Sequence, residues 1–136
     1  MWRWPVLVTA RVVRGFEPPP KPWLPGHRGV DLEAVPGDVV VAAGAGTISY
    51  AGSLAGRGVV TVWHGDLRTT YEPVTATVQV GDRVEAGEQI GVLAAGVSHC
   101  GGVPPCLHWG LLRGTTYLDP LLLLGLSHPI LLPIPN

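Results

Sequence analysis

Two segments of the chain carry ordinary metal-ligand side chains, and they lie far apart in the sequence. In the first, His27 and Asp31 are four residues apart, within a stretch that Gly26 and Gly29 allow to turn. An imidazole and a carboxylate at this spacing can reach one metal ion, and both are common zinc ligands. An isolated pair of this kind is more often a surface histidine beside an unrelated aspartate, so a further ligand is needed.

The second segment is a short apolar run that contains Cys106 and His108. If it forms a strand, the alternation of side chains places Cys106 and His108 on the same face. His108 then completes a set of two histidines and one aspartate with a fourth position open for water, which is typical of catalytic zinc. The residues therefore predict one zinc site at His27, Asp31 and His108.

The two cysteines of the chain, Cys100 and Cys106, are separated by a short loop of glycine, valine and proline. Such a loop can bring their Cα atoms within disulfide range, with a loop-closure stabilisation of roughly 2 kcal/mol. A disulfide would indicate an oxidising compartment. In the alternative, the Cys106 thiolate is a fourth zinc ligand, which would close the open position and make the site structural.

The elements that must position these residues are short, because 19 glycines and 14 prolines recur through the 136 residues. Runs rich in β-branched and aromatic residues alternate with turn formers, and His64 to Asp66 is typical of a hairpin turn. The fold class predicted is all-β, a small antiparallel sandwich or barrel. We expect strands over 39–42, 46–51, 59–63, 68–72, 75–80, 89–93 and 107–113, and a short helical segment within 118–124.

Composition excludes several classes of protein. The length fits one domain, and 46% hydrophobic against 14% charged residues excludes a disordered chain. A net charge of −1 provides no cationic surface, so nucleic acid is not expected as a partner. No run reaches the roughly 18 apolar residues of a membrane span. The first residues lack the apolar centre of a signal peptide, so a signal segment is expected to be absent from this chain.

Taken in order, these features resemble the lysostaphin-type zinc endopeptidases, also called the LytM or glycylglycine endopeptidase family, which cleave peptide cross-links in bacterial cell walls. The resemblance implies a small antiparallel β domain with His27, Asp31 and His108 as zinc ligands. It divides the chain into an N-terminal strand and proline-rich arm (1–25), the metallopeptidase-family domain (26–124) and an apolar C-terminal extension (125–136). The landmarks are Trp4-Pro5, Phe16, His27 with Asp31, Pro36-Gly37, His64-Gly65, Tyr71, the hairpins of 80–91, His108-Trp109 and Asp119-Pro120.

The resemblance also reveals two replacements. The family uses two histidines that are not ligands to activate water and stabilise the transition state: the last residue of Tyr-x-His and the first of His-x-His. Pro73 and Cys106 hold these positions here. In a regular strand, Glu72 points away from Tyr71 and Pro73. His99, in the loop before the last long strand, is the nearest substitute base, although a loop histidine is more often simply solvent-exposed.

Three hypotheses of function follow from the resemblance. The leading one is an exported, zinc-binding but catalytically degenerate domain that binds or regulates at peptidoglycan or on a cell-wall enzyme. The second is an active zinc endopeptidase that cleaves peptidoglycan cross-links, and the third is a metal-free structural extracellular domain. We expect a monomer that is secreted or held in the cell envelope, with a Cys100–Cys106 disulfide favoured by the exported family. Trp23 and Tyr71 are candidates for a substrate groove.

Overall fold

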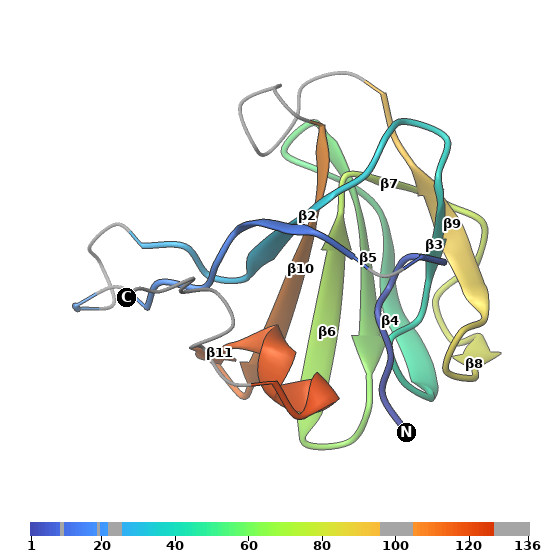
Figure 1. Cartoon of the computed structure of the whole chain (residues 1–136). Coiled ribbons are helices and arrows are strands. Elements are labelled where there is room, and N and C mark those ends of the chain that lie inside the picture. The colour runs from blue at the N-terminus through green and yellow to red at the C-terminus, as the bar shows by residue number, and fades with distance from the viewer. Residues whose placement is uncertain (9, 19, 22–25, 96–104, 127–136) are drawn as a thin grey trace.

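The fold is all-β, as predicted. A computed structural model describes residues 1–8, 10–18, 20–21, 26–95 and 105–126 of the chain. Within these residues, short strands are joined mainly by tight turns, and a single 3-10 turn follows the last strand (Figure 1). The elements are β1 (Val12–Arg14), β2 (Val30–Glu33), β3 (Val39–Val41), β4 (Gly46–Leu54), β5 (Arg57–Trp63), β6 (Leu67–Glu72), β7 (Val74–Ala76), β8 (Arg83–Val84), β9 (Gln89–Leu93), β10 (Cys106–Arg113), β11 (Thr116–Leu118) and η1 (Pro120–Leu124).

Two antiparallel sheets enclose the core. The larger has the strand order β1-β2-β10-β6-β5-β4-β8, with β11 paired to β10 beside this path, and the smaller has the order β3-β9-β7. Figure 1 shows the smaller sheet beside the larger one, with β9 and β3 on the right. Apolar side chains from both sheets fill the space between them, as in a sandwich. The largest buried ones are Trp109, Tyr71, Leu32, Ile48 and Ile90.

Strand β10 lies between β2 and β6 and carries the second metal-ligand segment. Leu107 and Trp109 belong to the core cluster, so alternation turns Cys106 and His108 to the opposite face. This confirms that Cys106 and His108 share one face of the sheet. In the register, His108 stands opposite Asp31 of β2 on one side and opposite Glu72 of β6 on the other.

The first ligand segment differs from the prediction of a turn. His27 lies just before β2, and Asp31 lies within it. The segment is extended because β2 pairs on both edges, with β1 and with β10. The sequence did not predict β2 or β11, which are four and three residues long. Such short strands show too little alternation to be recognised alone.

The N-terminal residues pack onto the domain. Arg3 N donates a hydrogen bond to Ala43 O (2.9 Å), and Val41 N donates one to Pro5 O (2.8 Å). Val6 is buried and forms a bridge with Val40 of β3. The expected arm, 1–25, therefore contributes to both sheets where it is described.

The described residues contain no helix long and apolar enough to cross a membrane.

Candidate metal centre

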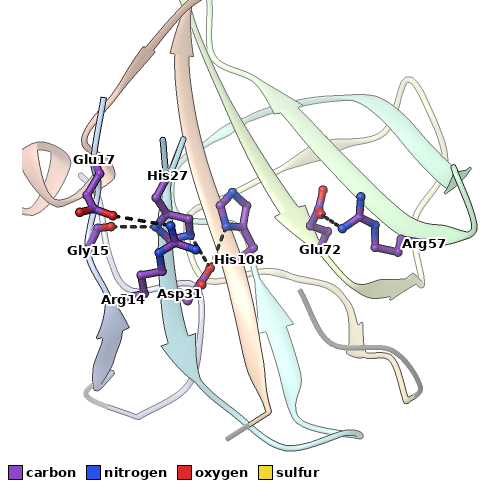
Figure 2. Close-up of polar contacts among 8 residues, drawn as sticks. All are labelled: Arg14, Gly15, Glu17, His27, Asp31, Arg57, Glu72 and His108. Carbon is purple, nitrogen blue, oxygen red and sulfur yellow. Dashed lines mark hydrogen bonds and ion pairs between the residues drawn. The ribbon is translucent and has the colours of Figure 1, made fainter. Parts of the chain in front are cut away.

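His27, Asp31 and His108 meet on the face of the larger sheet that lies away from the core. One ligand atom from each lies within 4.8 Å of the others. The three residues are 2%, 1% and 8% exposed, respectively. Figure 2 shows the two imidazoles on either side of the Asp31 carboxylate. Residues that are 81 positions apart at the extremes are thus brought together, as the spacing and alternation predicted.

The backbone around β2 fixes these side chains. His27 is held in a two-way bridge to Glu17, with hydrogen bonds of 2.7 and 2.9 Å. Asp31 is positioned by the direct pairing of β2 with β10 opposite His108. Gly29 leaves room for the imidazole, because a Cβ there would lie 2.7 Å from Nε2 of His108 and 2.5 Å from the carbonyl oxygen of Trp109. The site therefore requires glycine at this position.

The hydrogen bonds identify the metal-binding nitrogen of His27. Its Nδ1 lies 2.7 Å from the carbonyl oxygen of Gly15. A carbonyl can only accept, so Nδ1 carries the proton, and Nε2 of the neutral ring is an acceptor. That Nε2 lies 3.1 Å from Oδ1 of Asp31, which is also an acceptor. Two acceptors at this distance repel unless a proton or a metal ion lies between or beside them.

The Asp31 carboxylate is ionised. Burial raises its pKa, but the hydrogen bond from His108 and the nearby imidazoles, which can carry positive charge, lower it by more, so the pKa lies well below its usual value. Oδ1 accepts a hydrogen bond from Nδ1 of His108 at 2.8 Å. Oδ2 is buried and has no hydrogen-bond partner among the described residues. A buried carboxylate oxygen without a partner is costly in an apolar surrounding, and a bound cation removes that cost.

The residues therefore fit a zinc ion. Two imidazoles and one carboxylate are the donor set of many catalytic zinc sites, and each has a donor atom directed into one small region. His27, Asp31 and His108 would hold the metal.

The residues at the two replaced histidine positions are both buried. Cys106 is on the same face of β10 as His108 and pairs in register with Glu33 of β2. Pro73 follows β6, and its carbonyl oxygen accepts a hydrogen bond from Ala94 N at 2.9 Å. Trp23, His99 and Cys100 lie outside the described residues. Their predicted roles, and the Cys100–Cys106 disulfide, remain predictions.

Tyr71 does not line a groove, so that expectation is wrong. Its side chain is completely buried in the core. The hydroxyl oxygen accepts a hydrogen bond from Ala43 N (3.0 Å) and bonds Oγ1 of Thr69 (2.7 Å). Burial raises the pKa of Tyr71 to about 12, although both hydrogen bonds lower it in part. The register of β6 places Tyr71 beside Val60 and Trp109, and this pairing cannot be read from the local sequence.

Sequence reasoning missed Glu72 as a residue of this face. The alternation predicted that Glu72 points away from Tyr71, and since Tyr71 is in the core, that direction is toward the face of His108. Figure 2 shows Glu72 on the strand next to that of His108, with Arg57 beyond it. Nη1 of Arg57 lies 3.3 Å from Oε2 of Glu72. The missing information was the side of the sheet on which Tyr71 packs.

The chain matches known proteins over most of its length. The uncharacterized protein Rv2891 of Mycobacterium tuberculosis (strain ATCC 25618 / H37Rv) is 51% identical over 132 residues, which are 93% of this chain and 52% of that protein. The chain thus spans about half the length of the curated relatives it matches.

Solved structures from several bacteria share the fold. Csd3 of Helicobacter pylori superposes with a TM-score of 0.72 at 26% identity, covering 89% of this chain and 34% of that one. The catalytic domain of the antimicrobial peptidase lysostaphin from Staphylococcus simulans has a TM-score of 0.69 at 26% identity, covering 86% and 93%. The model of peptidase family M23 matches residues 25–120, a span that includes all three candidate ligands. This chain therefore belongs to peptidase family M23, the family of the LytM and lysostaphin-type peptidases.

Proposed function

We propose that this domain is a zinc-dependent hydrolase that acts outside the cytoplasm on the peptide cross-links of bacterial peptidoglycan. One observation carries the proposal: Nε2 of His27 and Oδ1 of Asp31, both acceptors, face each other at 3.1 Å in a buried site completed by His108. When bound there, a zinc ion supplies Lewis-acid chemistry to a peptide carbonyl and to water. Membership of the family supports peptidoglycan peptides as the substrate class and export as the location.

The protein's own residues supply the positioning. Asp31 stays ionised and accepts the Nδ1 proton of His108, which fixes the orientation of that ring. The carbonyl of Gly15 fixes the ring of His27 in the same way. These contacts hold the rings of His27 and His108 in place in the folded chain.

A second function is favoured by the two replaced histidines. Pro73 has no side chain that can transfer a proton, and Cys106 is buried beside the site. Without a base, the same zinc-holding domain would bind peptidoglycan or a cell-wall enzyme and regulate it, as the sequence led us to expect. The choice between the two functions therefore depends on whether another residue can move protons.

One experiment tests both functions. Protein purified without chelator is analysed for zinc by mass spectrometry and incubated with purified peptidoglycan, and released amino groups are measured. We expect about one zinc per chain, new amino groups, and loss of both in His108→Ala. Zinc with binding to peptidoglycan but no new amino groups would support the regulatory function. A wild-type protein that takes up no zinc would overturn both.

A further inference from the structure

We infer that Glu72 is the general base of this site, a role that rests on the proposed hydrolase function. Pro73 and Cys106 replace both family histidines, so another residue must transfer the protons. The position of Glu72 in the sheet makes it suitable for this role. The family motif does not assign this residue.

Asp31, His108 and Glu72 form one row across three neighbouring strands. His108 of β10 stands directly opposite Asp31 of β2 and directly opposite Glu72 of β6. Residues directly opposite in antiparallel strands have Cβ atoms about 4.5–5.5 Å apart and point to the same face. Glu72 therefore begins beside a metal ligand, on the face where the metal would bind.

Two features hold the Glu72 side chain. Tyr71, its neighbour in the chain, is locked in the core, so Glu72 cannot turn to the other face without unpairing β6. Arg57 forms an ion pair with Oε2 at 3.3 Å, which orients the carboxylate. Arg57 starts β5 directly after a two-residue turn in which Ala55 and Gly56 have positive φ, which ties its backbone to β4. Arg57 is thus a positioning residue for Glu72.

Glu33 provides the comparison. It is also a glutamate on this face, opposite Cys106, and is paired with an arginine, Arg11, at 3.8 Å. Its side chain is 44% exposed, whereas that of Glu72 is 19% exposed. Glu33 is in register with Cys106 and not with a metal ligand. A carboxylate shielded from water and next to a ligand is the better placed of the two for proton transfer.

Hydrolysis of the peptide bond by this route needs one carboxylate and one water molecule. The water oxygen adds to the peptide carbonyl carbon while the carboxylate of Glu72 accepts a water proton. The protonated carboxyl then gives this proton to the amide nitrogen as the C–N bond breaks. The products are a carboxylic acid and an amine, and Glu72 returns to its carboxylate form. General acid and base catalysis of this kind is typically worth about 10²- to 10⁴-fold.

The test is Glu72→Gln, which keeps the size and polarity of the side chain but removes the proton acceptor. In zinc-loaded protein, we expect kcat on a cross-link peptide to fall at least about 100-fold, with KM changed less than about threefold. The zinc content should stay that of the wild type. Glu33→Gln is the matched control and should retain wild-type kcat.

A second measurement does not depend on activity. Acetohydroxamate binds zinc and places its hydroxyl proton against a neighbouring base, so its affinity reports that base. We expect its dissociation constant for the zinc-loaded protein to rise at least about tenfold in Glu72→Gln and to stay unchanged in Glu33→Gln. If Glu72→Gln does not fold, Glu72→Ala with added formate is measured instead, and recovery of cleavage by formate would support the assignment.

The measurements distinguish a wrong assignment of Glu72 from a wrong hydrolase function. If the wild type cleaves and Glu72→Gln cleaves as well, with equal acetohydroxamate affinity, Glu72 is not the base, and the hydrolase function stands. If zinc-loaded wild type cleaves no peptidoglycan peptide, both are overturned. If Glu72→Gln loses zinc, Glu72 acts in metal binding and the assignment as a base is wrong.

Discussion

The Nε2 atom of His27 and the Oδ1 atom of Asp31 lie 3.1 Å apart, and both are acceptors when the ring is neutral and the carboxylate ionised. This pair stores electrostatic repulsion that a cation relieves. A metal ion that binds only the folded protein also stabilises it by mass action, by about 2.7 kcal/mol at a concentration 100 times its dissociation constant.

We therefore predict that zinc raises the melting temperature of the protein by about 5–10 °C over the chelated form. Differential scanning calorimetry with zinc or with EDTA measures the shift. In His108→Ala, which lacks one ligand, zinc should produce little or no shift. Equal melting temperatures for the zinc and EDTA samples of the wild type would contradict the predicted site.

Gly29→Ala should damage the site through its shape. The added Cβ would lie 2.7 Å from Nε2 of His108 and 2.5 Å from a backbone oxygen, so the imidazole must move. We expect zinc content well below that of the wild type and a loss of about 1–3 kcal/mol in the free energy of unfolding. Gly52→Ala is the control, because its nearest atoms lie at 3.7 Å. Normal zinc content in Gly29→Ala would show that the ring does not need this space.

The substitution Tyr71→Phe tests whether the Tyr71 hydroxyl stabilises the core or contacts a bound peptide. Loss of the hydroxyl leaves Ala43 N without its hydrogen-bond acceptor in a buried place, which costs about 1–3 kcal/mol of unfolding free energy. Zinc content and affinity for peptidoglycan peptides should not change. Tyr50→Phe, whose hydroxyl bonds Ser53 O at the surface, should cost less. Urea unfolding and peptide binding measure the two effects, and weaker peptide binding in Tyr71→Phe at unchanged stability would restore the groove role.

The candidate ligands could be predicted because their signals are local. His27 and Asp31 follow a four-residue spacing, and alternation alone places Cys106 and His108 on one face. The position of Glu72 depends on the pairing of β6 with β10, which joins residues far apart in the chain. For the same reason the sequence could not show that Tyr71 packs in the core. Local alternation gives relative directions of side chains, and only the register of the sheet shows which direction leads to the site.

A chain of hydrogen bonds near the edge of the core predicts how stability depends on pH. Nδ1 of His64 lies 2.7 Å from the carbonyl oxygen of Ala45, so Nδ1 carries the proton. Nε2 then accepts from Oγ1 of Thr69 at 2.8 Å, and Thr69 in turn accepts from the hydroxyl of Tyr71. The chain ends at Ala43 N, which can only donate to Tyr71. A proton on Nε2 of His64 would remove the acceptor of the Thr69 hydroxyl proton.

We predict that His64 makes the folded state less stable in acid. Burial lowers the pKa of His64 below its ordinary value of 6.5, and the hydrogen bond to Ala45 offsets only part of this effect. Below pH 6.5 the unfolded chain therefore binds more protons at this residue than the folded chain does, so stability falls as the pH falls. The contribution of His64 is complete above about pH 6.5 and is lost as the pH drops through the folded-state pKa. Urea unfolding of metal-free protein at pH 7.5 and 5.5 measures this loss, and His64→Asn, which keeps a donor toward Ala45 but cannot titrate, should show a smaller one. An equal or larger loss in His64→Asn would mean that other groups set the acid sensitivity.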